Sequence, residues 1–196
     1  MMFNNLIAKE GQSKVFYLFL AFVLFFILDC EFLSFIFFVL TIWFALIYRN
    51  KRLEKDYDIS DILAPISGKV STIDKRDNKI QIIIDVSLCD NHILRAPKNG
   101  NFILIHQKGL NTLLDSLKAK KLNEKATIKY SDMNIELISS LYGTDISIFS
   151  NEALMGDKLG VFLHGQVIVE LDNSQEILVN IGNKVESGKT VLARAK

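Results

Sequence analysis

Two dense apolar runs stand near the start of the chain, at residues 15–28 and 32–48, and only the three residues DCE separate them. Ten of the 14 phenylalanines lie in these two runs. The pattern predicts two helices joined by an acidic turn. Each run is shorter than the roughly 20 residues that a spanning helix needs, so a thin transmembrane hairpin and a re-entrant wedge are both open. A hairpin buried inside a soluble fold is the third alternative.

Charged residues on either side of the hairpin predict its orientation. The basic residues that flank it are Lys9, Lys14, Arg49, Lys51, Arg52 and Lys55, whereas the turn carries only acids. The positive-inside rule then places both termini on the cytoplasmic side of the inner membrane. The chain shows no single apolar core followed by small residues, so we expect no cleaved signal peptide.

Beyond residue 57 the pattern changes to short apolar runs broken by turn residues, which predicts a mainly β fold with minor α content. The strands are expected at residues 70–73, 80–86, 102–105, 146–149, 161–163, 167–171 and 177–181. The charged stretch 118–125 is either a loop or a short helix, and its basic residues either form a solvated face or contact anionic lipid. The predicted organisation is an N-terminal segment (1–14), the hairpin (15–48), a linker (49–62) and a β domain (63–196).

Composition excludes several classes of function. The 23 Lys and Arg nearly balance the 22 Asp and Glu, so nothing indicates the basic surface of a nucleic-acid-binding protein. Cys30 and Cys89 lie in different settings and in no metal-ligand spacing, so we expect neither a disulfide framework nor a metal site.

Residues 90–97 (DNHILRAP) hold the most concentrated chemistry of the chain. The Asp90 carboxylate, the His92 imidazole and the Arg95 guanidinium could together bind an anionic headgroup and move protons. A hydrogen-bonded structural His92, and an Arg95 in a salt bridge with Asp90 or Asp85, are the simpler alternatives.

Two glycine-containing turns, residues 64–70 (APISGKV) and 182–189 (GNKVESGK), resemble the paired turns of the lipoyl and biotinyl barrel-sandwich folds. We therefore expect the β domain to be barrel-sandwich-hybrid-like. A lipoyl or biotinyl carrier is disfavoured, because the expected hairpin tip at residues 172–175 (DNSQ) has no Lys.

The order of these motifs resembles the short, membrane-anchored branch of the phosphatidylserine decarboxylase family. Residues 8–11 (AKEG) are similar to its A-R-E-G, residues 64–70 to S-P-A-D-G-K-V, and residues 90–97 to the D-V-H-x-N-R-A-P signature. Residues 105–109 (IHQKG) resemble Y-H-P-G, 122–125 (LNEK) echo E-N-E-R, and 156–166 (GDKLGVFLHGQ) resemble G-E-R-F-G-M-I-R-F-G-S. The resemblance implies a role in phospholipid metabolism.

The same resemblance implies what this chain lacks. In active members a Ser attacks the carbonyl of the preceding Gly, the chain is cleaved, and the new end becomes a pyruvoyl group that acts as the decarboxylation cofactor. The corresponding positions here are Gly165 and Gln166, and Ser67 stands where the family has the Asp that orients the catalytic His. His92 is then the only member of the triad that remains, so we expect no pyruvoyl cofactor.

Three hypotheses follow. The favoured one is a membrane-anchored pseudoenzyme that keeps a groove for aminophospholipid and acts as a binding or regulatory subunit, as a homo-oligomer or beside an active paralogue. The second is an active phosphatidylserine decarboxylase that forms phosphatidylethanolamine. The third is a membrane-tethered structural or adaptor protein of barrel-sandwich fold.

Overall fold

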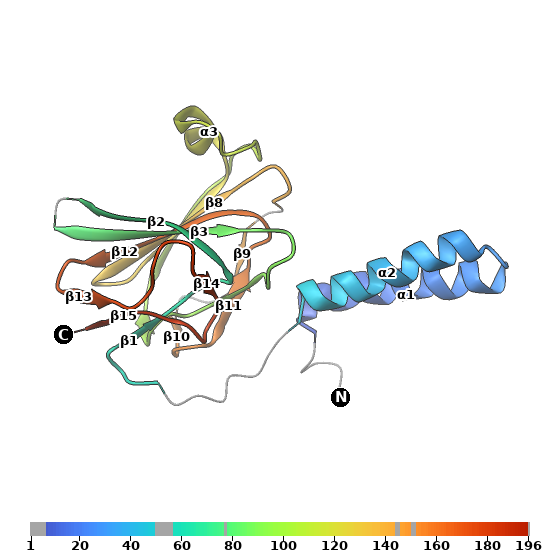
Figure 1. Ribbon diagram of the computed structural model, residues 1–196, viewed down its shortest axis with the longest axis horizontal. Coiled ribbons are helices and arrows are strands. Elements are labelled where there is room, and N and C mark those ends of the chain that lie inside the picture. Colours follow the sequence, from blue (N-terminus) through green and yellow to red (C-terminus); the bar gives the residue numbers. More distant parts are fainter. Residues whose placement is uncertain (1–6, 50–56, 77, 144–145, 150–151, 196) are drawn as a thin grey trace. The chain divides into compact units, whose positions relative to one another are not determined.

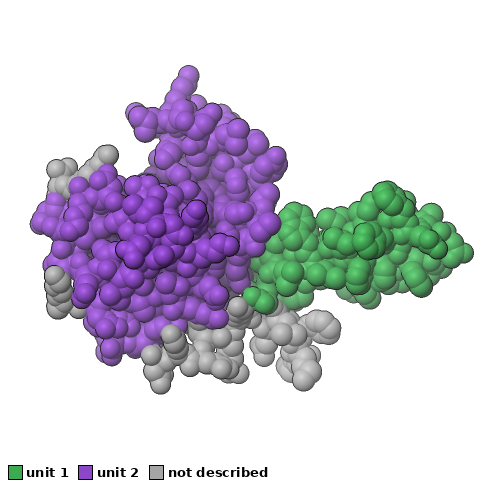
Figure 2. Space-filling model, viewed as in Figure 1, with its two compact units in different colours: residues 1–52 green, residues 53–196 purple. Residues whose placement is uncertain are grey.

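The computed structural model describes residues 7–49, 57–76, 78–143, 146–149 and 152–195. The chain divides into two compact units, Met1–Arg52 and Leu53–Lys196 (Figure 2). Half of the predicted linker, residues 50–56, lies outside the described residues.

The first unit is the predicted helical hairpin, formed by α1 (Lys9–Ile27) and α2 (Glu31–Ile47) (Figure 1). Aromatic contacts join the two helices, and the rings of Phe25 and Phe37 stack with their centroids 5.2 Å apart. At the open end Ala8 N donates to Tyr48 O at 2.8 Å. Both ends of the hairpin therefore lie together, as the sequence predicted.

A thin transmembrane hairpin is one of the three alternatives that the sequence left open. In the described part of the chain, no helix combines the length and the apolar character needed to cross a membrane. The α2 helix is 17 residues long, and α1 begins with the polar segment that contains Lys9 and Lys14. The transmembrane form of the prediction is therefore not supported.

The second unit is mainly β. Its strands are β1 (Asp61–Leu63), β2 (Gly68–Arg76), β3 (Lys79–Val86), β4 (Ile93–Arg95), β5 (Gly100–Asn101), β6 (Ile103–Gln107), β7 (Lys125–Lys129), β8 (Met133–Ser139), β9 (Ser147–Ile148), β10 (Glu152–Ala153), β11 (Lys158–Val161), β12 (Gly165–Asp172), β13 (Gln175–Ile177), β14 (Lys184–Val185) and β15 (Val191–Ala195). One short helix, α3 (Leu117–Leu122), lies between β6 and β7.

These strands pair in four sheets among the described residues (Figure 1). The largest has seven strands in the order β14-β2-β3-β12-β8-β7-β6. The smaller sheets are β1-β15-β13, β4-β11-β9 and β10-β5. All the strand pairs are antiparallel.

The core is built on the inner face of β3, β12 and β8, where alternate side chains are buried. Val169 of β12 is completely buried, and it pairs with Ile82 of β3 and Ile135 of β8. Such alternation is expected for strands that present one face to a core.

Several sequence-predicted strands are confirmed and others are displaced. The segments 70–73, 80–86 and 167–171 lie within β2, β3 and β12. The expected strands at 161–163 and 177–181 overlap β11 and β13 by one residue each. The alternative of a short helix within 118–125 is confirmed by α3. His106, within the segment that resembles Y-H-P-G, lies in β6.

The two glycine-containing turns pack against each other. Strand β14 pairs with β2, and Gly188 N donates to Ala64 O at 2.8 Å. Segments separated by more than 100 residues in the sequence are thus hydrogen-bonded to each other.

Candidate functional site

Two motifs that the sequence singled out lie side by side. Strand β4, within residues 90–97, pairs with β11, within residues 156–166. Just beyond this pairing, Phe162 N donates to His92 O at 3.0 Å. The His motif and the Gly-Gln motif therefore form a single site in the β unit.

His92 is completely buried at this site. Its Nε2 lies 3.2 Å from Leu88 O, and because a carbonyl oxygen only accepts hydrogen bonds, this contact places a proton on Nε2. Burial lowers the pKa of His92, and hydrogen bonding to the backbone of Leu88 and Phe162, together with the charge of Asp90, offsets this shift only in part. Burial therefore favours the neutral imidazole, and its Nδ1 is buried without a hydrogen-bond partner among the described residues.

Gly165 is required at its position by backbone geometry. Its φ is +143°, and a Cβ added there would lie 2.1 Å from Ile138 O, a backbone atom of the neighbouring strand β8. Only a residue without a side chain fits such a conformation at such a distance. The presence of Gly at 165 is thus explained by the fold, and it does not by itself indicate chain cleavage.

Gln166 follows directly and points its amide at the adjacent strand. Its Nε2 donates to Asp85 Oδ1 at 2.9 Å, and the two residues are paired across β12 and β3. Gln166 Oε1 is buried and has no hydrogen-bond partner among the described residues. An amide held by a carboxylate occupies the position where the resemblance places a reactive hydroxyl.

Ser67 does not contact the His92 ring through a hydrogen bond. Its Oγ accepts from Ser187 N at 2.9 Å, and Ser187 Oγ in turn lies 2.7 Å from Ile93 O. Ser67 therefore connects the two glycine-containing turns, and through Ser187 it supports the backbone next to His92. As a hydroxyl it supplies no negative charge to orient an imidazole.

Asp90 and Arg95 are both engaged within the fold. Asp90 Oδ2 accepts from Ser87 N at 2.8 Å and closes a turn. Arg95 is buried, and its Nη1 donates to Gly156 O at 2.8 Å. Burial lowers the pKa of Arg95, and Asp157, rather than Asp90 or Asp85, is the acid that raises it. This geometry favours the structural interpretation of Arg95 over direct contact with a lipid phosphate.

His164 was not among the candidate site residues taken from the sequence, but it lies at this site. Burial lowers its pKa, its Nδ1 is buried without a partner among the described residues, and its ring meets that of Tyr142 edge-on at 6.0 Å. Its charged form also lowers the pKa of His92, so the two imidazoles lie close together. Its place next to Gly165 was the signal that could have identified it.

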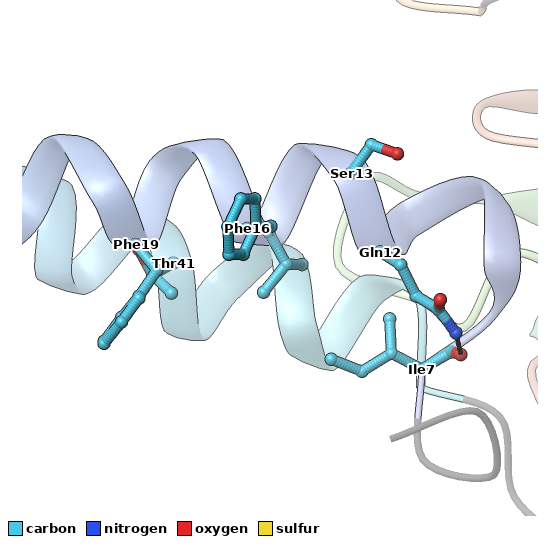
Figure 3. Close-up of a pocket in the computed structure, with 7 residues that line it drawn as sticks. Ile7, Gln12, Ser13, Phe16, Phe19 and Thr41 are labelled. Atoms are coloured by element: carbon cyan, nitrogen blue, oxygen red, sulfur yellow. Dashed lines mark hydrogen bonds between the residues drawn. The ribbon is translucent and has the colours of Figure 1, made fainter. Parts of the chain in front are cut away.

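A pocket of about 700 Å³ lies in the separate hairpin unit (Figure 3). Ile7, Val15, Phe16 and Phe19 give it an apolar wall, and Gln12, Ser13 and Thr41 complete it. Two of these polar side chains are held by the backbone, since Gln12 Nε2 donates to Ile7 O and Thr41 Oγ1 donates to Phe37 O. The pocket therefore offers mainly apolar contacts.

Metal-binding and cysteine chemistry find no support in the residues described. No three His, Cys, Asp or Glu side chains in that part of the chain gather to hold a metal ion. Cys30 and Cys89 are both exposed free thiols.

Comparisons with known proteins agree with the sequence resemblance. No family model and no solved structure matches the chain. A phosphatidylserine decarboxylase proenzyme of Desulfotalea psychrophila is 24% identical over 183 residues, which cover 85% of this chain and 86% of that protein. A Methanosarcina barkeri protein assigned as an archaetidylserine decarboxylase proenzyme is 29% identical over 167 residues, 80% of this chain and 79% of its own length. The similarity extends along most of both relatives, and it supports the assignment of the chain to the phosphatidylserine decarboxylase family.

Proposed function

We propose that the chain is a membrane-anchored, phosphatidylserine decarboxylase-related protein of phospholipid metabolism that stays uncleaved, carries no pyruvoyl group and acts in lipid binding or regulation. Its relatives, named as decarboxylase proenzymes, support the general role in phospholipid metabolism. The finer part of the proposal depends on the residues of this chain.

The identity of residue 166 supports the proposed absence of the pyruvoyl group. A pyruvoyl group forms from a Ser hydroxyl, and Gln166 has no β-oxygen to attack the Gly165 carbonyl. The Gln166 amide is also hydrogen-bonded to Asp85, so its side chain already has a structural partner. The residues at this position therefore do not fit the cofactor.

The retained site suits a ligand that donates hydrogen bonds. His92 Nδ1, His164 Nδ1 and Gln166 Oε1 are buried acceptors without partners among the described residues. Buried polar atoms are normally paired, with protein, water or ligand. A neutral imidazole accepts a hydrogen bond from an ammonium group, which is the chemistry of an aminophospholipid headgroup. We therefore favour His92 and His164 over Arg95 as the headgroup contacts.

The hairpin is the proposed membrane anchor. Large apolar side chains are exposed along it, including Phe32 at 76% and Tyr17 at 69%. Apolar surface of this extent normally marks an interaction site. A re-entrant or interfacial hairpin whose two ends return to the cytoplasmic side agrees with the contact between Ala8 and Tyr48 at its open end.

The intact mass of the purified full-length chain tests the proposal. We expect one species near 22.3 kDa. Two chains, with a ketone at the start of the smaller one, would refute it and favour the active decarboxylase, the alternative that the names of the relatives also favour.

Restoring the lost groups sharpens this test. Gln166→Ser returns the hydroxyl, and Gln166→Ser combined with Ser67→Asp returns the carboxylate as well. We expect cleavage at most in the double variant, because the single variant still lacks the acid that orients the His. Gln166→Ala is the matched control, since it removes the amide without supplying a nucleophile.

A further inference from the structure

Outside the His92 site, one surface of the β unit combines exposed leucines with several lysines. It lies on α3 and the segment before it, and Figure 1 shows α3 projecting from the end of the seven-stranded sheet. We call it the α3 surface, and it consists of Lys108, Leu110, Leu113, Leu117, Lys118, Lys120, Lys121 and Leu122.

The leucines of this surface are exposed although the chain around them is well ordered by hydrogen bonds. Leu117 is 80% exposed, while in the same helix only Ala119 is buried. Ser116 is the N-cap of the helix, and its side chain accepts from Ala119 N at 3.1 Å. Leu110 N donates to Leu122 O at 2.8 Å, so the preceding segment lies directly against the end of the helix.

A buried Asn123 fastens this surface to the sheet. Its Nδ2 donates to Thr112 O at 2.6 Å and to Ser139 O at 2.8 Å, and its Oδ1 accepts from Thr112 N at 3.1 Å. The exposed leucines therefore lie on a segment whose backbone is hydrogen-bonded to the sheet. Apolar side chains held outward in this way indicate a binding surface.

The charges indicate what the surface binds. Four lysines accompany the leucines, and Asp115 is the only acid between residues 108 and 122. None of the four lysines makes an ion pair with a described residue, whereas Lys125, just beyond, is paired with Glu136. Leucines that enter the lipid and lysines that meet lipid phosphates are the features of an interfacial membrane contact.

We propose that the α3 surface is a membrane-docking site of the β unit and that it binds the surface of a bilayer containing anionic lipid. The lysines supply the attraction to anionic headgroups, and the leucines, Leu117 above all, enter the interface. The inference goes beyond the proposed function, because it depends neither on the His92 site nor on the cleavage state of the chain.

Fluorescence quenching in reconstituted bilayers tests the proposal on the full-length chain. In a Cys30→Ser, Cys89→Ser background, Leu117→Cys is labelled with a polarity-sensitive dye, and Ile181→Cys, at a 62% exposed apolar position elsewhere in the unit, is the matched control. The chain is placed in nanodiscs of phosphatidylcholine, alone or mixed with phosphatidylglycerol, with doxyl-labelled phosphatidylcholine as the quencher. We expect quenching at 117 but not at 181, and only with phosphatidylglycerol present.

Charge reversal tests the contribution of the lysines of the α3 surface separately from that of its leucines. Lys118→Glu, Lys120→Glu and Lys121→Glu together should abolish quenching at 117. Reversal of three exposed lysines elsewhere, Lys75, Lys129 and Lys184, should leave it unchanged.

Equal quenching at 117 and 181, none at 117, or the same quenching without phosphatidylglycerol would each overturn the proposal. Shielding of the 117 dye from aqueous acrylamide in the absence of lipid would overturn it too, because a second copy of the chain would then cover the surface. The intact-mass result is unaffected by all of these outcomes.

Discussion

Gly165 offers the most direct test of how the fold constrains the site. Gly165→Ala adds a Cβ that would lie 2.1 Å from Ile138 O and 3.1 Å from Phe162 Cζ, at a φ of +143°. Placing a non-glycine residue in such a backbone conformation costs about 1–3 kcal/mol. Overpacking against atoms that move little costs about 1–3 kcal/mol more. We therefore expect Gly165→Ala to lower the free energy of unfolding by about 2–6 kcal/mol, a large fraction of the about 5–15 kcal/mol that stabilises a typical domain.

Gly182 provides the matched control. Its φ is +91°, but nothing lies within 4 Å of an added Cβ. Gly182→Ala should therefore carry only the conformational cost of about 1–3 kcal/mol. Urea unfolding of both variants, followed by circular dichroism, gives the difference that belongs to the contact with Ile138. A difference below about 0.5 kcal/mol, the usual error of such comparisons, would refute the steric account of Gly165.

Three further predictions concern the core and the site. Ile135→Ala, at a completely buried position of β8, should lower the free energy of unfolding by about 2–5 kcal/mol in urea titrations, and a loss below about 1 kcal/mol would contradict its central place in the core. Burial lowers the pKa of His92 in the folded state below its value in the unfolded state, so the unfolded state binds more protons just below about pH 6.5. The contribution of His92 to the free energy of unfolding should therefore be complete above that pH and decline as the pH falls toward the folded pKa. His92→Gln should reduce this pH dependence in unfolding measured from about pH 5 to 7.5, and an unchanged slope would mean that the ring is not held neutral. Arg95→Ala should lower the free energy of unfolding by about 1.5–3 kcal/mol, because the Gly156 carbonyl loses a charged donor. Lipid binding by the protein that remains folded should persist. A loss of lipid binding at unchanged stability would instead identify Arg95 as a headgroup contact.

The sequence determined the elements whose side-chain pattern is strong and local. The hairpin follows from two phenylalanine-rich runs and an acidic turn, and β3 and β12 follow from their apolar alternation. Strands β1, β4 and β15 were not predicted, although they are largely buried. Such short strands exist because a partner strand is present, and an isolated sequence does not contain the partner.

The residues of the candidate site were largely identifiable from sequence, but their contacts were not. The family resemblance of the sequence motifs was enough to indicate His92, Ser67, Gly165 and Gln166. Only the tertiary structure showed that Gln166 is bonded to Asp85, since that contact joins two strands about 80 residues apart. A hydrogen bond of this kind depends on strand register, and a shift of one residue would turn each side chain to the opposite face of the sheet.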